Sequence, residues 1–154
     1  IKVYSINLIF YQFDYTHLYI YMKIITFGTF DLIHIGHINI LEGCKNFNNN
    51  KSKNELIVGI SSDKFSYKKK NRYPIYNEEQ RKKILESLRF VDKVFIEESF
   101  ERKREYILEN KADIFIMGDD WKNKFDEFND ICQVIYLPRT PSISTTEIVE
   151  FIKK

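Results

Sequence analysis

The chain has 154 residues, of which 44% are hydrophobic and 30% charged, a balance typical of one soluble globular domain with a sizeable core. Its formal net charge of +2 excludes a general nucleic-acid-binding surface, so basic residues matter only where they cluster. Its two cysteines exclude a disulfide-held scaffold and favour a reducing, cytoplasmic location.

The segment Ile1–Tyr21 differs from the rest, because it is mostly apolar and aromatic with interruptions at Asn7, Gln12 and Asp14. A membrane-spanning helix needs about 20 predominantly apolar residues, and a signal peptide needs a basic start and a small-residue cleavage site. Met22 stands directly before the first clean strand. We therefore expect residues 1–21 to be an extension ahead of the natural start and residues 22–154 to form the domain. A short hydrophobic anchor or an added edge strand are the alternatives.

Beyond this segment, apolar runs alternate with helical patterns. Strands are predicted at residues 23–27, 55–60, 93–96, 114–117 and 133–137. Helices are predicted at residues 36–47, from a cap at Asn77 to about residue 89, at 100–110, and after a capping box at 144–147. Residues 46–54 are predicted to be a polar turn and residues 63–76 a basic loop. This alternation predicts an α/β fold, a parallel sheet with helices on both faces.

In such sheets ligands bind beyond the carboxyl ends of the strands. Four predicted loops, 28–37, 63–76, 118–121 and 139–144, follow strands and are expected to converge on one cleft.

The most informative of these loops contains the motif His34-Ile-Gly-His37, where a strand runs through a glycine turn into a helix. A helix start attracts phosphate, because it has unpaired N–H groups and a partial positive charge. Residues at i and i+3 share a helical face, so both imidazoles can donate to the oxygens of one phosphoryl group. The same turn supplies a hydroxyl, an apolar wall and two positions without Cβ at Thr29, Phe30, Gly28 and Gly36.

Two other interpretations of the histidine pair stay open. The histidines could be ordinary polar residues on a surface helix, or metal ligands with Cys44 two turns further on. A metal site is disfavoured, since structural zinc takes four Cys or His ligands at recognisable spacing and the chain has no CxxC or HExxH.

Residues 139–146, RTPSISTT, are the second phosphate-binding candidate. Arg139 can form a forked, charge-assisted pair with phosphate, and the hydroxyls of Ser144, Thr145 and Thr146 open a helix whose N–H groups can add to it. A plain loop with a helix cap is the alternative.

Several charged clusters have both a functional and an ordinary interpretation. The basic run Lys68–Arg72 is either a solvated loop or a site for an acidic acceptor or a triphosphate. Arg89 at a helix end is also a favourable charge on the helix dipole. In Met117–Trp121, Asp119 or Asp120 could accept from a ribose or base amine, bind a divalent ion, or simply cap a turn.

Together these residues resemble the HxGH nucleotidyltransferases, and within them the cytidylyltransferases that act on glycerol 3-phosphate. The resemblance covers residues 22–154 and rests on GTFDLIHIGH, ESLRFVDKV at residues 86–94, MGDDW and RTPSISTT. It implies a Rossmann-like fold, a homodimer, and transfer of CMP from CTP to glycerol 3-phosphate with Mg²⁺, giving CDP-glycerol for teichoic acid.

The resemblance also implies roles for individual residues. His34, His37 and Arg139 would be catalytic. The acceptor side would be formed by Lys70, although Lys69 fits the spacing too, and by Lys103, with Asp31 ordering the turn. The nucleotide would contact Thr29, Phe30, His34, Ile35, Gly36, His37, Arg89, Asp120, Arg139, Thr140, Pro141, Ser142, Ile143, Ser144, Thr145 and Thr146.

The sequence departs from the family pattern at two places in this region. Ser142 stands where the family has glycine, and residues 46–55 form a longer loop than usual. Other acceptors (ethanolamine or choline phosphate), ATP in place of CTP, and a non-catalytic nucleotide sensor are the rival hypotheses.

Overall fold

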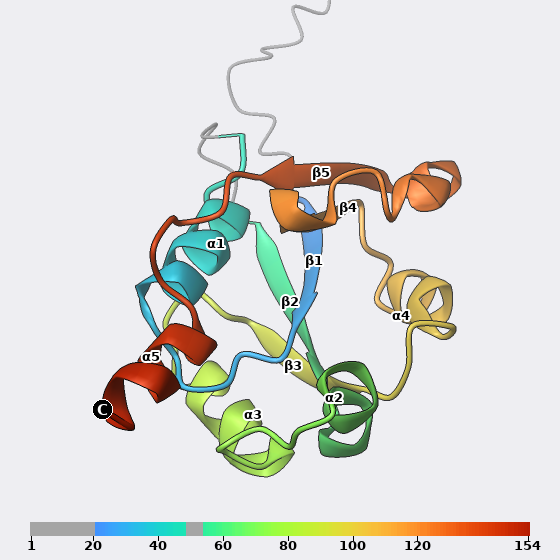
Figure 1. Ribbon diagram of the computed structural model, residues 1–154. Coiled ribbons are helices and arrows are strands. Elements are labelled where there is room, and N and C mark those ends of the chain that lie inside the picture. The colour runs from blue at the N-terminus through green and yellow to red at the C-terminus, as the bar shows by residue number, and fades with distance from the viewer. Residues whose placement is uncertain (1–20, 49–53) are drawn as a thin grey trace, which may run out of the picture.

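The computed structural model describes residues 21–48 and 54–154, so the predicted extension, apart from Tyr21, and residues 49–53 of the longer loop lie outside the described residues. Five parallel strands form one sheet in the order β3-β2-β1-β4-β5. Figure 1 shows this sheet between layers of helices. The strands are β1 (Lys23–Gly28), β2 (Glu55–Ser61), β3 (Lys93–Glu97), β4 (Ile114–Gly118) and β5 (Gln133–Leu137).

Both faces of the sheet are covered, as the sequence predicts. One core cluster joins strand residues to α1 (Ile35–Lys45) and α3 (Glu78–Glu86) through Leu41, Cys44 and Leu85. The other joins the opposite face to α4 (Lys103–Glu109) and the short 3₁₀ helix η3 (Asp126–Asp130). Alternate residues of β1 enter opposite clusters, Ile24 the first and Ile25 the second. This is the pattern of a strand buried on both sides.

The predicted basic loop is wrong in its first half, because Asp63–Lys70 form a helix, α2. The Ser62 hydroxyl accepts from the Phe65 N–H, and Asp63 lies in the first turn. Three lysines in the last turn interact favourably with the partial negative charge at the carboxyl end of the helix. Asn71 ends the helix in a left-handed conformation. The segment lacks an apolar stripe, so end effects rather than periodicity define this helix.

The remaining elements follow the predictions with shifted ends. The helix predicted to reach residue 89 ends at Glu86, where tighter i→i−3 backbone bonds, such as Leu88 N–H to Leu85 C=O, carry the chain onward. The last helix, α5 (Thr145–Ile152), is capped by Ser144 as predicted. A 3₁₀ turn, η2 (Asp119–Trp121), follows β4. No helix in the described part of the chain is long and apolar enough to cross a membrane.

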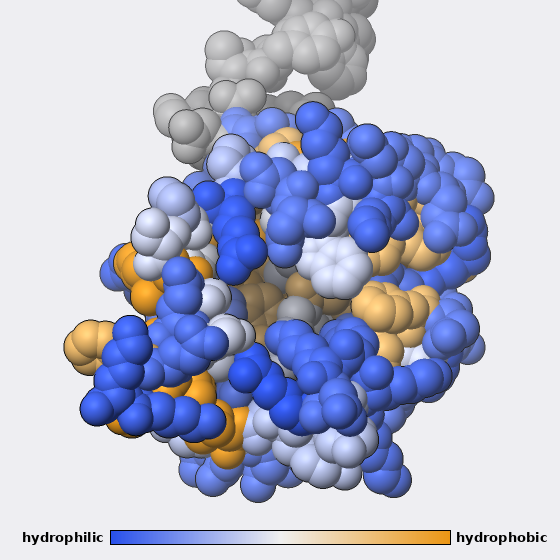
Figure 2. Space-filling view, viewed as in Figure 1, coloured by the Kyte–Doolittle hydropathy of each residue, from blue (hydrophilic) through white to orange (hydrophobic). Residues whose placement is uncertain are grey.

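The order of the strands places the site. From β1 the chain proceeds outward to β2 and β3, then returns to β4 beside β1 and continues to β5. The loops after β1 and β4 therefore diverge, and such a switch point leaves a crevice at the carboxyl edge of the sheet. In the space-filling view of Figure 2, the surface is hollowed near its middle, with hydrophobic residues inside a hydrophilic rim.

Candidate active site

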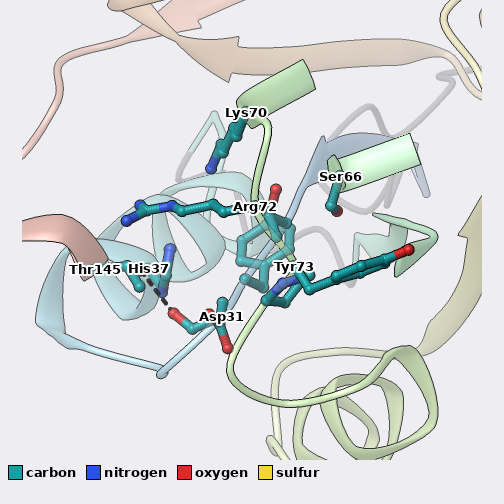
Figure 3. A pocket seen from close by; sticks show the side chains of 10 residues that line it. Asp31, His37, Ser66, Lys70, Arg72, Tyr73 and Thr145 are labelled. Atoms are coloured by element: carbon teal, nitrogen blue, oxygen red, sulfur yellow. Dashed lines mark hydrogen bonds between the residues drawn. The ribbon is translucent and has the colours of Figure 1, made fainter. Parts of the chain in front are cut away.

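A cavity lies at this edge, and the segments that follow β1, β2 and β5 all contribute to it. Its lining includes residues of the predicted phosphate-binding turn, the basic segment and the last helix. Figure 3 shows the nitrogen atoms of Lys70, Arg72 and His37 turned toward the same space. The residues that line it are Thr29, Phe30, Asp31, His37, Ser66, Lys70, Arg72, Tyr73, Pro74 and Thr145.

The two histidines form a stacked pair at the start of α1. Their ring centroids lie 3.8 Å apart with an interplanar angle of 21°. His34 is the N-cap, and its Nδ1 accepts from the Gly36 N–H at 3.1 Å. Because that nitrogen is an acceptor, the proton of the neutral His34 ring is on Nε2, which is left to donate to a ligand.

Burial keeps this pair neutral. It lowers the pKa of His37 to about 3, with further contributions from the charges of His34 and Lys70. Burial also lowers the pKa of His34, assisted by the positive charge of Arg139. His37 packs edge-on against Phe30, and its Nδ1 has no hydrogen-bond partner among the described residues. Near pH 7 the pair therefore presents N–H dipoles rather than charges.

A side chain at position 36 would be crowded. A Cβ built on it would lie 3.0 Å from the His34 ring and 3.2 Å from the Ile143 side chain. Any larger residue would push the imidazole or the residue 139–144 loop away.

Asp31 orders the turn, as the sequence analysis expects. Its carboxylate accepts from the N–H groups of Ile75 and Tyr76 at 2.7 and 3.0 Å. The residues on either side of it, Phe30 and Leu32, have φ of 51° and 46°, in the left-handed region that L-residues rarely adopt. The bonds to Asp31 therefore hold a turn that local preference alone would not form.

Arg81 on α3 also fixes this turn, and this role of Arg81 was not predicted from the sequence. Its side chain is fully buried and donates to the carbonyls of Thr29 and Tyr76 at 2.8 and 2.9 Å and to the Asp63 carboxylate at 2.6 Å. The signal in the sequence was its position four residues before the buried Leu85, which places a cation on the inner face of α3.

The basic segment divides between two environments. Lys70 lines the cavity, and loss of hydration together with the charge of Arg72 lowers its pKa. Lys69 turns inward, where its Nζ donates to the Ser61 hydroxyl at 2.6 Å and burial lowers its pKa to about 8. Arg72 donates to the Thr146 hydroxyl at 2.8 Å and so reaches α5.

The residue 139–146 segment forms the opposite wall. Thr145 Oγ1 donates to the Asp31 carbonyl at 2.7 Å, and Thr140 Oγ1 accepts from Asn39 at 2.9 Å. The Arg139 backbone N–H donates to Asp119, and the Arg139 side chain is exposed and lies close enough to His34 for its charge to act on that ring. A second hollow is formed by Arg139, Thr140, Pro141, Ser142, Ile143 and Glu147.

Other predicted residues lie outside the main cavity. Arg89 is exposed in the turn after α3, and Asp120 is exposed in η2. Lys103 is 1% exposed and pairs with Glu97 instead of opening to the cavity. Burial raises the pKa of the Cys44 thiol to about 12, as fits an apolar packing role.

Known proteins are similar to this chain in sequence and in fold. Residues 25–151 match the family model described as cytidylyltransferase-like. Glycerol-3-phosphate cytidylyltransferase of Bacillus subtilis is 49% identical over 131 residues, covering 84% of this chain and 96% of that protein. The enzyme of the same name from Staphylococcus aureus is 42% identical over 126 residues, 82% of this chain and 91% of that protein.

A solved structure supports the fold alone. The lipopolysaccharide core biosynthesis protein of Thermoplasma volcanium superposes with a TM-score of 0.66 at 22% identity, covering 77% of this chain and 98% of that one.

Proposed function

The chain belongs to the cytidylyltransferase-like family, and from that membership we propose that it transfers CMP from CTP to glycerol 3-phosphate, giving CDP-glycerol and pyrophosphate. The observation that carries the proposal is the stacked pair of His34 and His37 at the start of α1, of which His37 lines a cavity together with Lys70 and Arg72. Donors and cations on opposite walls suit two phosphate-bearing substrates that meet between them.

The reaction is an in-line displacement at the α-phosphorus. An oxygen of the acceptor phosphate forms a bond to that phosphorus, the bond from the α-phosphorus to the oxygen that bridges it to the β-phosphorus breaks, and pyrophosphate leaves with that oxygen. The acceptor is already an anion at neutral pH, so no strong general base is required. Catalysis is therefore positioning and charge stabilisation.

The residues divide these tasks by position. His34, His37 and Arg139 stabilise the charge that develops on the transferred phosphoryl group. The turn with Thr29 and Phe30 and the start of α5 close over the nucleotide, and Lys70 holds the acceptor phosphate. The remaining nucleotide contacts are proposed at Ile35, Gly36, Arg89, Asp120, Thr140, Pro141, Ser142, Ile143, Ser144, Thr145 and Thr146.

Magnesium fits this site as an ion that arrives with CTP. Within residues 21–48 and 54–154 no group of three or more His, Cys, Asp or Glu side chains is arranged to hold a metal, and the Asp31 carboxylate is committed to backbone N–H groups. We propose that triphosphate oxygens and water hold the ion, where it neutralises phosphate charge.

Pyrophosphate release tests the proposal directly. CTP or ATP is offered with glycerol 3-phosphate, ethanolamine phosphate or choline phosphate in the presence of magnesium. We expect release with CTP and glycerol 3-phosphate only. Pyrophosphate release with a different pair would show that the enzyme uses another nucleotide or acceptor. CTP binding without pyrophosphate release from any pair would show that the protein is a nucleotide sensor.

Two further parts of the proposal are a homodimer and a cytoplasmic location serving teichoic acid synthesis. Large apolar side chains such as Phe151 and Ile152 of α5 are 79% and 73% exposed, which a subunit interface would cover. Sedimentation of the purified chain tests the dimer, and fractionation of the source cells tests the location.

A further inference from the structure

One face of the molecule combines exposed basic side chains with exposed aromatic and aliphatic ones. Lys64, Tyr67 and Lys68 are exposed on one side of α2, since residues three and four apart share a helical face. Tyr73 and Ile75 follow in the segment that leads to α3, and they are 62% and 61% exposed. We call the face formed by these five residues the α2 surface.

The apolar side chains of the α2 surface are held in place although they are exposed. The ring centroids of Tyr67 and Tyr73 lie 4.7 Å apart with an interplanar angle of 30°, so the helix and the segment after it form one continuous surface. The Asp31 carboxylate accepts from the N–H groups of Ile75 and of the next residue, which fixes the backbone there. The Ile75 side chain therefore projects into solvent from a backbone that cannot easily turn it inward.

The charge of this region is one-sided. Of the six charged side chains between residues 63 and 76, five are basic, in a chain whose net charge is only +2. Within the described part of the chain, no salt bridge joins Lys64 or Lys68 to a carboxylate. Glu101, in the turn before α4, lies close enough to Lys68 for the two charges to interact, which still leaves the surface positive.

This combination of side chains fits a layer of lipid headgroups better than a protein partner. The cores of protein–protein interfaces are depleted in lysine, whereas the two basic residues of the α2 surface are both lysines. At a membrane surface, lysine side chains reach the phosphates of anionic lipids, and tyrosine rings lie at the level of the headgroups. An aliphatic side chain that projects beyond them enters the boundary of the acyl chains.

We propose that the α2 surface docks the protein on an anionic lipid surface. The two lysines lie against the headgroup phosphates, and the two tyrosines and the isoleucine lie at the boundary of the acyl chains. Figure 1 shows α2 and the segment after it at the bottom of the molecule, opposite the end at which the chain enters β1. Tyr73 also lines the cavity, so the docked protein holds the opening of the candidate active site beside the lipid. This inference goes beyond the proposed function and does not depend on it.

Flotation of the purified full chain with lipid vesicles tests the docking. One set of vesicles contains phosphatidylcholine alone, and the other also contains phosphatidylglycerol, which is anionic. We expect binding at low salt only to the vesicles with phosphatidylglycerol, and weaker binding as salt screens the charges. Absence of binding to both sets, or equal binding to both, overturns the proposal.

The double variant Lys64→Glu/Lys68→Glu tests the contribution of the lysines. One basic side chain near an anionic surface is worth about a fivefold change in binding, so reversing two charges should weaken vesicle binding by at least about 25-fold. The matched control is Lys122→Glu/Lys124→Glu, which makes the same change in net charge at two exposed lysines between η2 and η3. An equal loss of binding in the control would show that the net charge of the chain attracts the vesicles, and would contradict the proposal.

The variant Ile75→Ser tests the apolar contact. We expect it to weaken vesicle binding about tenfold, and to do so at high salt as well, because burial of an aliphatic side chain is not screened. Leu108→Ser is the control, since Leu108 on α4 is 54% exposed but lies outside the α2 surface. Unchanged binding in Ile75→Ser, or an equal loss in Leu108→Ser, would contradict the proposed mode of docking.

Polyglutamate distinguishes a lipid surface from an acidic protein partner. Tighter binding of the unaltered chain to polyglutamate than to the anionic vesicles would assign the α2 surface to such a partner and overturn the proposal. Circular dichroism should show the same fold in every variant, because each substitution is at an exposed side chain. Absence of pyrophosphate release by the unaltered chain would refute the proposed function instead, while vesicle binding would still decide the docking.

Discussion

The stacked histidines are useful because they are neutral. His34 has one ring nitrogen occupied by the Gly36 N–H, so its orientation and its donating nitrogen are fixed before a ligand arrives. His37 is held by burial and by the Phe30 ring. Donors that are aligned in advance require no reorganisation when charge develops on a phosphoryl group.

Replacing His37 with alanine should therefore affect turnover more than folding. We expect kcat for pyrophosphate release to fall about 10²- to 10³-fold, the effect of removing one aligned donor. Circular dichroism should show an unchanged fold, because the ring packs on Phe30 at the edge of the core. A folded variant with near-normal turnover would contradict the catalytic assignment.

The lowered pKa of His37 should also make the protein less stable in acid. The unfolded chain binds a proton at this residue below about pH 6.5 and the folded chain only below about pH 3, so unfolding takes up a proton between these values. Stability is therefore lost as the pH falls through this window, by about 2 kcal/mol between pH 7 and pH 5.

Urea unfolding at pH 7 and pH 5 measures this loss. The comparison is with His37→Gln, which removes the titrating group, so its stability should change about 2 kcal/mol less between the two pH values. An equal pH dependence in both proteins would show that His37 is not held neutral in the folded state.

The backbone conformation of Ser142 lowers the stability of the folded protein. Its φ of 56° is in the left-handed region, and Ser142 stands where the pattern of the family has glycine. Ser142→Gly should stabilise the protein by about 0.5–1 kcal/mol, since relief of the strain exceeds the added entropy of the unfolded chain.

Thermal unfolding measures this gain. Asn71→Gly is the matched control, because Asn71 has φ of 51° but asparagine tolerates this conformation, so its gain should be smaller. A decrease in Tm for Ser142→Gly would show that the serine makes a stabilising contact.

Among the elements, some could be predicted from local sequence patterns and others, such as α2, could not. The HxGH turn, the strands and the cap of α5 follow from periodicity and capping patterns. The helix α2 was not predicted, because its only buried apolar side chain is Phe65. The capping residue and the charges at its two ends are individually weak signals. The inward course of Lys69 and Lys103 depends on Glu97, a partner distant in sequence, so no local pattern predicts it.

Arg81 should be the most sensitive single residue of α3. Arg81→Met leaves two carbonyls and a carboxylate without their donor, and we expect a loss of about 2–4 kcal/mol in urea unfolding. Arg81→Lys should recover little of this, because an ammonium lacks the planar fork that reaches all three acceptors. Lys83→Met, at an exposed position of the same helix, is the control, and its effect should stay within about 0.5 kcal/mol.

For the whole molecule, the alternation of strands and helices was sufficient to predict the parallel sheet, both covered faces and the edge that holds the site. The convergence of the segments after β1, β2 and β5 was also predicted, because parallel strands end at the same edge of the sheet, whereas the predicted loop 118–121 after β4 does not line the cavity. Their mutual hydrogen bonds, such as Thr145 to the Asp31 carbonyl, were not, since they join residues far apart in the chain.

A chain that begins at Met22 contains every described strand and helix. Among the contacts of the described residues, it loses only the exposed hydrogen bond from Tyr21 to Glu55, which contributes little. We expect its Tm and its kcat/KM for CTP to match those of the full chain within error. A substantial drop in either value would assign a structural or functional role to the preceding residues.

The bond from Thr145 to Asp31, with those from Arg72 to Thr146 and Asn39 to Thr140, joins the last part of the chain to the first. A ribosome must therefore release the chain as far as residue 146 before the cavity has both of its walls. Incomplete products of synthesis would carry the histidine pair without the segment that closes over it. They would be unable to consume CTP, so interrupted translation yields inactive protein rather than an unregulated enzyme.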